Sequence, residues 1–325
     1  MRRRKFLTLL GGAAALGPLA AHAQVMPVVV YLNTGAAEHS AYLVTAFRQG
    51  LSEAGFSEGQ NVAIEYRWAN NEPKRLPELA ADLVRRRVAV IVAPGASEGV
   101  LAAMAATTTI PIVFRTGGDP VALGLVPSLN RPGGNVTGVN AMSLEIVTKR
   151  VGLLHDLAPA ITRFALLFNP RDPNAEPYTK ELQGAAAALG LQVEFFGARN
   201  SQEIDVAFAA LVKRRSEALL VVPQGLLINR RVQIVTHATR HGLPASYPNR
   251  EFTDIGGLMS YGPNGADQYR QTGVYAGRVL KGEKPADMPV ERAPKFEFII
   301  NLQTARILGI EIPTSLLAGA DEVIE

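Results

Sequence analysis

The segment Gly95-Ala96-Ser97-Glu98-Gly99 has the G-x-S-x-G spacing that places a nucleophilic serine between a strand and a helix in many hydrolases. Such a serine needs an acid and then a histidine on later loops at the same sheet edge. The later histidines are His155, His237 and His241, and all fall within expected helices. We therefore interpret Ser97 as a helix cap or a ligand hydrogen-bond donor, and we expect no catalytic residue. A secreted serine hydrolase that uses Ser97 is the enzymatic alternative.

His237 and His241 have the i, i+4 spacing with which two imidazoles can hold a metal ion on one helix face. No glutamate follows His237 as the zinc-protease motif requires, and the pair lies beside Gly242, where the helix is expected to end. A solvent-exposed helix face accounts for this spacing, so we expect no metal site. The sequence also contains no phosphate loop and no cysteine. We therefore expect no cofactor, no thiolate metal site and no disulfide.

Small polar residues recur directly after the expected strands. The segments are Asn33-Thr34-Gly35, Gly95-Ala96-Ser97, Arg115-Thr116-Gly117-Gly118-Asp119, Asn169-Pro170-Arg171-Asp172, Pro223-Gln224-Gly225 and Tyr261-Gly262. The carboxyl ends of parallel strands share one edge of a sheet, and ligands bind beyond that edge. Hydroxyl and amide groups with two carboxylates and two arginines suit a small polar ligand held by directional hydrogen bonds. Each residue taken singly can instead cap the helix that follows it.

The elements that would position these residues alternate between strand and helix. Strands are expected at 28–32, 62–68, 88–93, 110–114, 136–139, 164–168, 193–196, 218–222, 258–261 and 296–300. Helices are expected at 40–54, 76–87, 98–106, 144–157, 178–189, 204–213, 229–241 and 268–280. This alternation predicts an α/β fold with parallel sheets covered by helices on both faces. Because a loop rich in Gly and Pro at 117–134 interrupts it, we expect two doubly wound lobes that face each other across a ligand cleft.

The first 23 residues have the layout of a cleaved secretory signal peptide. A basic run from Arg2 to Lys5 precedes a short apolar stretch, and Ala21-His22-Ala23 provides the small residues that a signal peptidase recognises. Four of the 33 lysines and arginines lie in this segment, which leaves the remainder equal in number to the 29 acidic residues. This charge balance argues against a nucleic-acid partner. We expect an exported, periplasmic protein that is not lipidated, and the consecutive arginines leave Sec and twin-arginine export open.

Several motifs occur in the order found in a known protein family. They are Glu65-Tyr66-Arg67-Trp68-Ala69, Ile110-Pro111-Ile112-Val113-Phe114, Asp119-Pro120-Val121, Gly124-Leu125-Val126, Arg131-Pro132-Gly133-Gly134-Asn135-Val136-Thr137-Gly138, Gly282-Glu283-Lys284-Pro285-Ala286-Asp287-Met288-Pro289 and Ile300-Asn301-Leu302-Gln303-Thr304-Ala305. With these motifs the chain resembles the ABC transporter substrate-binding protein family, whose characterised relatives include tryptophan-type amino-acid binders. The resemblance covers nearly all of the chain after the signal segment.

The resemblance implies a type I periplasmic-binding fold, in which two lobes joined by three crossings close around a ligand like a hinge. It implies a first lobe of residues 24–140 and 265–296 and a second lobe of residues 141–262 and 297–325. The first lobe would provide ligand contacts from Asn33, Thr34, Ser97, Thr116 and Asp119. The second lobe would provide them from Asn140, Asn169, Gln224, Tyr247 and Tyr261.

The function implied by the resemblance is capture of a small polar solute, such as an amino acid, for an ABC-type membrane permease. Asp119 could receive an ammonium group, and Ser97 and Thr116 could donate to a carboxylate. Arg115 would give the pocket a positive charge, so an acidic solute is an alternative ligand. We expect a monomer that is not an enzyme. A sensory partner of a membrane receptor would have the same sequence features, and it is the alternative to transport.

Overall fold

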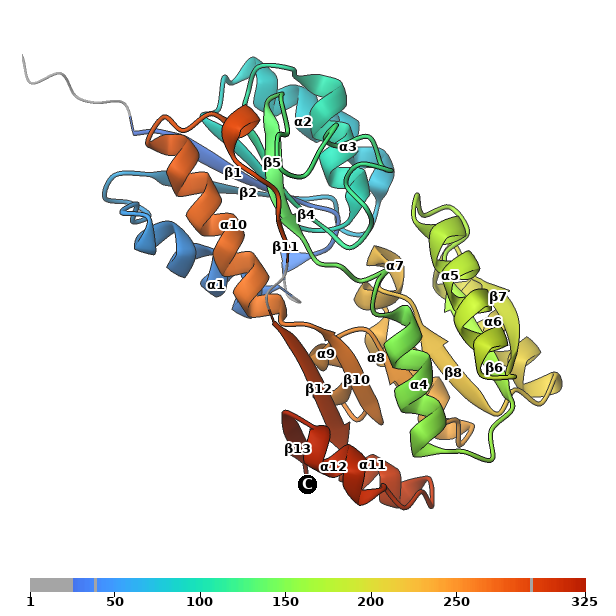
Figure 1. Cartoon of the computed structure of the whole chain (residues 1–325). Coiled ribbons are helices and arrows are strands. Elements are labelled where there is room, and N and C mark those ends of the chain that lie inside the picture. Colours follow the sequence, from blue (N-terminus) through green and yellow to red (C-terminus); the bar gives the residue numbers. More distant parts are fainter. Residues whose placement is uncertain (1–25, 38–39, 293–294) are drawn as a thin grey trace, which may run out of the picture.

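The computed structural model describes residues 26–37, 40–292 and 295–325, and the predicted signal segment at residues 1–23 lies outside this range. Two lobes, each built on one β-sheet, lie next to each other (Figure 1). Within the described part of the chain, no helix combines the length and the apolar character needed to cross a membrane.

The first lobe contains a six-stranded sheet with the strand order β11-β5-β4-β3-β1-β2, in which all neighbours are parallel. Its strands are β1 (Val28–Asn33), β2 (Ala63–Trp68), β3 (Val90–Ala93), β4 (Ile112–Thr116), β5 (Val136–Asn140) and β11 (Glu291–Arg292). Its helices are α1 (Ala41–Glu53), α2 (Leu76–Arg85), α3 (Ser97–Ala106) and α10 (Gly265–Leu280), with short 3₁₀ helices η2 (Pro73–Arg75) and η3 (Pro285–Asp287).

Helices cover both faces of this sheet, which explains why its central strands β1 and β3 are almost entirely apolar. Successive side chains of a strand point to opposite faces. Val29 and Tyr31 accordingly belong to a core cluster shared with α1 and α10, whereas Val30 and Leu32 belong to one shared with α2 and α3. The continuous apolar run of β1 is therefore the signature of a strand buried on both sides.

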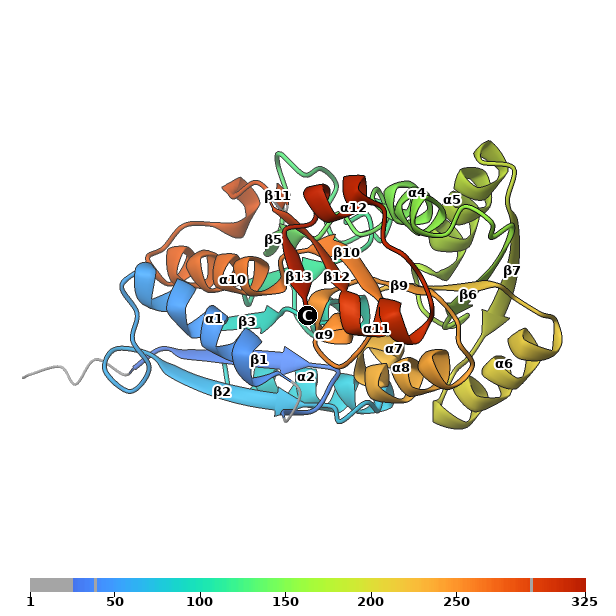
Figure 2. The same ribbon diagram turned by 90° about the horizontal axis from the view of Figure 1, so that it is seen from below.

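Glycines allow α1 and α10 to pack with their backbones in contact. A Cβ atom on Gly50 of α1 would lie 1.7 Å from the carbonyl oxygen of Arg270, and one on Gly273 of α10 would lie 2.1 Å from that of Phe47. Neither position can hold a side chain unless the helices separate. The two helices lie side by side in Figure 2, and together they cover one face of the first-lobe sheet.

The second lobe contains a seven-stranded sheet with the order β13-β12-β10-β9-β8-β6-β7. Its strands are β6 (Arg163–Phe168), β7 (Gln192–Gly197), β8 (Ala218–Val221), β9 (Ala245–Tyr247), β10 (Met259–Pro263), β12 (Phe296–Asn301) and β13 (Glu322–Ile324). Its helices are α4 (Val147–Leu157), α5 (Ala175–Ala188), α6 (Ser201–Lys213), α7 (Gly225–Asn229), α8 (Arg231–Arg240), α9 (Arg250–Thr253), α11 (Leu302–Ile307) and α12 (Thr314–Gly319). One large core cluster fills this lobe.

The chain passes between the two sheets three times, after β5, after β10 and before β12. Strand β10 leads towards the first lobe and β12 returns from it, so the two strands pair antiparallel, from Met259 with Ile300 to Pro263 with Phe296. Beyond this pairing, the amide of Asn264 donates to the carbonyl oxygen of Lys295 at 3.1 Å. Two of the three connections are therefore bonded to each other at the lobe boundary.

The predicted α/β fold of two lobes with parallel sheets is confirmed, with β12 and β13 as the strands that run against the rest of the second sheet. One long helix was expected at 229–241, but the structure has α7 and α8 there, with a break at Arg230. The short elements β9, α9, α11, α12 and β13 were not expected. Each has too few residues to show a periodic pattern.

Candidate functional site

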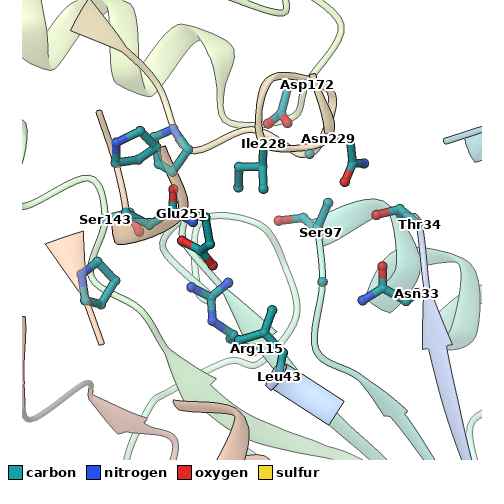
Figure 3. Close-up of a pocket in the computed structure, with 18 of the residues that line it drawn as sticks. Asn33, Thr34, Leu43, Ser97, Arg115, Ser143, Asp172, Ile228, Asn229 and Glu251 are labelled. Atoms are coloured by element: carbon teal, nitrogen blue, oxygen red, sulfur yellow. The ribbon is translucent and has the colours of Figure 1, made fainter. Parts of the chain in front are cut away.

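A cavity of about 100 Å³ lies between the two lobes, beyond the carboxyl ends of their parallel strands. Figure 3 shows labelled side chains from both lobes around it. The first lobe contributes the ends of β1, β3 and β4 together with parts of α1 and α10. The second lobe contributes the loops after β6, β8 and β9 and the short helices α7 and α9. The polar segments that follow strands in the sequence therefore meet at one place.

Neutral hydrogen-bonding groups of the first lobe form one side of the cavity. Asn33 and Thr34 follow β1, and Ser97 begins α3. The side-chain oxygen of Asn33 accepts a hydrogen bond from the Gly35 amide at 2.7 Å, which fixes the turn after β1. The hydroxyls of Ser97 and Thr116 lie 2.9 Å apart and share a hydrogen bond. These contacts hold the side chains in place before any ligand arrives.

Arg115 is the cation that the first lobe presents to the cavity. Its Nε donates to the side-chain oxygen of Gln268, which is buried in α10. Its guanidinium carbon lies 5.5 Å from the ring centroid of Tyr269, a cation–π distance. Among the described residues, no carboxylate lies within the 4.0 Å ion-pair distance of Arg115. Because Nε is already bonded, the two terminal nitrogens remain to bind a planar anion.

Glu251 is an anion that the second lobe presents to the same cavity, from the first turn of α9. The hydroxyl of Tyr42, on α1 of the first lobe, donates to its Oε1. Its Oε2 is buried and has no hydrogen-bond partner among the described residues. In Figure 3 the Arg115 side chain extends into the cavity towards Glu251. The cavity thus has a cationic donor from one lobe and a carboxylate acceptor from the other.

A second carboxylate, Asp172, lines the cavity from the loop after β6. Burial raises the pKa of Asp172, although hydrogen bonds from Asn174 and Gln224 oppose this shift. Glu98 lies in the first turn of α3 in the first lobe, and burial together with the charge of Asp172 raises the pKa of its carboxyl. The two lobes therefore bring two carboxylates towards each other, which disfavours full ionisation of the pair.

The remaining lining is partly apolar. Leu43 of α1 and Ile228 of α7 face the cavity with three prolines, Pro223, Pro248 and Pro263. Asn229 also lines it and approaches the first lobe, because a Cβ atom on Gly35 would lie 3.2 Å from its side-chain oxygen. The site thus combines opposite charges, neutral hydrogen-bonding groups and an apolar patch. That combination suits a small organic molecule with charged and apolar parts.

The predicted first-lobe contacts occupy three kinds of position. Asn33, Thr34 and Ser97 line the cavity. Thr116 is fully buried one layer behind it and bonds to Ser97. Asp119 is exposed outside it, where its carboxylate accepts hydrogen bonds from the amides of Val121 and Ala122 and so caps its own loop. The acidic groups at the cavity are instead Asp172 and Glu251.

The five contacts predicted for the second lobe are not among the residues that line the cavity: Asn140, Asn169, Gln224, Tyr247 and Tyr261. Asn140 ends β5, so the structure places it in the first lobe and not in the second. The side chains of Asn140, Asn169 and Gln224 form hydrogen bonds within the protein. Asn140 accepts from the Met142 amide at 2.8 Å, and Gln224 bonds to the backbone of Asn169. The ring of Tyr247 stacks on Phe252, and the ring of Tyr261 stacks on Phe296.

Four residues that line the cavity are not predicted from the sequence: Ser143, Asn174, Asn229 and Glu251. Asn229 and Glu251 belong to α7 and α9, which are too short to give a periodic signal. Arg115 and Asp172 stood in strand-end segments, and their charge was the signal that could have ranked them above their neutral neighbours. In the described lining, Ser97 has no histidine beside it.

Comparison with known proteins shows a consistent set of similarities. The family model of the ABC transporter substrate-binding proteins matches residues 28–324. A tyrosine-binding protein of Clostridioides difficile is 28% identical over 266 residues, which cover 82% of this chain and 76% of that protein.

Two solved structures each cover 92% of this chain and 99% of their own. One is an ABC domain from Streptococcus pneumoniae in complex with L-Trp, which is 25% identical with a TM-score of 0.84. The other is a ligand-free, open substrate-binding protein with adhesive properties from Clostridium difficile, which is 25% identical with a TM-score of 0.67.

Proposed function

This chain belongs to the ABC transporter substrate-binding protein family, and from that premise we propose that it captures an amino acid in the cavity between its lobes. The observation that supports this ligand most directly is the pair of opposite charges, Arg115 on the first lobe and Glu251 on the second. Family membership confirms that the chain is a binding protein and not an enzyme. Ser97 therefore acts as a hydrogen-bonding group and not as a nucleophile.

A zwitterionic amino acid fits this pair of charges. The terminal nitrogens of Arg115 can donate two parallel hydrogen bonds to the ligand carboxylate. The unpartnered Oε2 of Glu251 can accept from the ligand ammonium, which satisfies a buried acceptor. The ligand would then connect the two lobes directly. A ligand with only one charged group leaves a buried charge unpaired and binds more weakly.

The apolar patch of Leu43, Ile228 and Pro248 would receive the ligand side chain. A relative that binds tyrosine and a structural neighbour that holds L-Trp make aromatic amino acids the first candidates. Asn229 and Thr34 stand in the same cavity and could bond to a phenol or an indole N–H.

Closure of the lobes around the ligand is part of the proposal. At equal identity and coverage, this structure is more similar to the L-Trp complex than to the open ligand-free protein, with TM-scores of 0.84 and 0.67. Tyr42 and Asn174 also make hydrogen bonds from one lobe to the other. The described arrangement is therefore compatible with a closed state, from which opening at the three connections would release the ligand.

We further propose that the protein works in the periplasm, after removal of residues 1–23, and delivers its ligand to an ABC-type membrane permease. The family description supports the transport role. The basic run and the small residues before Gln24 support export. Mass spectrometry of the secreted protein should find Gln24 at its N-terminus, and retention of the first 23 residues would contradict this part of the proposal.

The first experiment is a thermal-shift screen with the twenty amino acids, sugars and nucleosides. A ligand that binds only the folded protein stabilises it by about 2.7 kcal/mol at 100 times its dissociation constant. L-Tyr or L-Trp should raise the melting temperature and be recovered unchanged. Stabilisation by sugars or nucleosides alone would contradict capture of an amino acid.

The second experiment tests the roles of the two charges by calorimetry with L-Trp, tryptamine and indole-3-propionate. Arg115→Gln and Glu251→Gln should each weaken L-Trp binding by about 30-fold or more, because losing one partner of a buried charge pair costs about 2–5 kcal/mol. Arg115→Gln should not weaken tryptamine binding, since that ligand has no carboxylate and leaves Arg115 unpaired. Glu251→Gln should do the same for indole-3-propionate, which has no ammonium. Equal losses for all three ligands would contradict the assigned roles, and exposed Arg131→Gln is the control.

A further inference from the structure

Asn174 occupies the N-cap position of α5, but its side chain does not cap that helix. An asparagine at this position normally accepts a hydrogen bond from an amide in the first turn of its own helix. Here the side-chain nitrogen donates to Asp172 at 3.2 Å and to the hydroxyl of Ser97 at 3.3 Å. Ser97 belongs to the first lobe, so the side chain extends across the cleft to the other half of the molecule.

The oxygen of the same side chain lies against a glycine of the first lobe. A Cβ atom on Gly118 would lie 1.8 Å from the Asn174 side-chain oxygen. Gly118 follows β4, and its amide donates to Thr116, which in turn bonds to Ser97. Nearby, the Tyr178 hydroxyl donates to the carbonyl oxygen of Gly117 at 3.4 Å. The first lobe thus forms a close-fitting niche for Asn174, and the absence of a side chain at Gly118 makes room for it.

We propose that Asn174, Ser97 and Gly118 form an interlobe latch that stabilises the closed state whether or not a ligand is bound. The latch is a property of the protein beyond its ligand contacts. Only the measurements of ligand affinity that test the latch rest on the proposed function. Asn174 and Ser97 belong to different lobes, so their contact exists only when the lobes are together. Both residues are nearly fully buried in this arrangement.

The latch sets ligand affinity through the fraction of closed protein. Apparent affinity falls in proportion to the population of the binding-competent state. A substitution that opposes closure therefore weakens binding without removing a ligand contact. Gly118 suits such a test because it does not line the cavity and its φ lies outside the left-handed region. An alanine there leaves the separated lobes unstrained, apart from a 3.0 Å contact with Leu123 in its own lobe.

The test uses Gly118→Ala, Asn174→Ala and the double variant, with Gly134→Ala as the matched control. Gly134 lies in a loop of the same lobe, and a Cβ atom there meets nothing within 4 Å. Gly118→Ala should weaken L-Trp binding by about 10- to 100-fold, the range expected for overpacking a close contact. Asn174→Ala should weaken it by about three- to tenfold, the range of one hydrogen bond. The double variant should bind better than Gly118→Ala alone, because removing the asparagine makes room for the new methyl group.

Lobe separation is measured in the ligand-free protein by energy transfer between two dyes. The chain contains no cysteine, so Glu78→Cys on α2 and Gln183→Cys on α5 provide two exposed labelling sites, one on each lobe. Gly118→Ala and Asn174→Ala should lower the transfer efficiency, and the double variant should recover part of the loss seen with Gly118→Ala. This readout needs no ligand, so it remains informative if no amino acid binds.

Equal transfer efficiency in Gly118→Ala and Gly134→Ala would overturn the latch, whatever the ligand is. A double variant that is no more closed than Gly118→Ala would also overturn it, because the two residues would then act independently. If L-Trp and L-Tyr fail to bind the unmodified protein while the dye experiment gives the expected order, the latch stands and the ligand proposal fails.

Discussion

In the first lobe, α1 and α10 pack backbone against backbone through Gly50 and Gly273. In the second lobe, one long side chain connects a helix to two strand ends. Arg150 of α4 is 1% exposed, and its Nη2 donates to the carbonyl oxygens of Val221 at 2.7 Å and Ser246 at 2.8 Å. Burial lowers the pKa of Arg150 to about 9, so the guanidinium stays charged at neutral pH. The contact between α1 and α10 is thus sensitive to added atoms, and the contact made by Arg150 is sensitive to lost polar groups.

The difference bears on how each lobe presents its side of the cavity. Gln268 and Tyr269 of the closely packed α10 contact Arg115, so the position of the cation depends on how α10 packs on α1. In the second lobe, the strand ends held by Arg150 lead into the loops that carry Pro223 and Asn249. Those loops depend on hydrogen bonds from a distant helix.

The largest effect is expected for Gly273→Ala. The new methyl group would lie 2.1 Å from the Phe47 carbonyl oxygen, so α1 and α10 must separate. We expect a loss of about 3 kcal/mol in the free energy of unfolding, measured by urea denaturation. Gly184→Ala on α5 is the second-lobe control, because its Cβ atom meets nothing within 4 Å. That variant should gain up to about 1 kcal/mol, and equal effects at both sites would remove the contrast between the lobes.

A smaller effect is expected for Arg150→Met. Methionine fills a similar volume but leaves two buried carbonyl oxygens without this donor, and relief of the buried charge offsets part of that cost. We expect a net loss of about 2 kcal/mol in the free energy of unfolding. The matched variant Arg150→Lys keeps a donor and a charge and should lie between Arg150→Met and the unmodified protein. If Arg150→Met proved as stable as the unmodified protein, the hydrogen bonds to Val221 and Ser246 would not stabilise the second lobe.

The smallest effect is expected for Glu98→Gln, where the two lobes meet. Burial and Asp172 raise the pKa of Glu98, so its ionised form costs stability at neutral pH. That cost fades as the pH falls towards the ordinary carboxyl value of 4.5, because the folded protein then binds the proton. Glu98→Gln should stabilise the protein at pH 7.5 and less at pH 5. Glu176→Gln, in the first turn of α5, is the control, and a gain that did not shrink at pH 5 would exclude this electrostatic origin.

The sequence predicts the architecture well because the two-sided burial of strands and the helical periods repeat over long segments. The expected strand at 28–32 is β1, Val28–Asn33, and the expected helix at 76–87 is α2, Leu76–Arg85. The strands of the second sheet are harder to predict, because β9 has only three residues. Without β9 and α9, Glu251 could not be placed at a strand end.

Single residues of the site were harder to predict than the fold, because the same residue type can serve a ligand or the protein. Asp119 and Asp172 both follow strands, yet Asp119 caps its own exposed loop and Asp172 lines the cavity. Gln224 follows β8 as expected but bonds to the backbone of Asn169. Which partner a side chain reaches depends on loop conformation, and strand periodicity carries no information about that.

The path of the chain between the sheets also determines when each lobe can be completed during synthesis. Helix α10 and strand β11 belong to the first lobe, although they follow β6 to β10 of the second lobe in the sequence. Tyr269, Tyr275 and Met288 complete the core cluster that Phe47 and Leu51 begin. A nascent chain therefore cannot finish its first lobe until about the last tenth of its length is being made. Until α10 is made, α1 can pack on the sheet but lacks its partner helix, and because β12 and β13 of the second lobe follow β11, neither lobe is complete before the last tenth of the chain is synthesised.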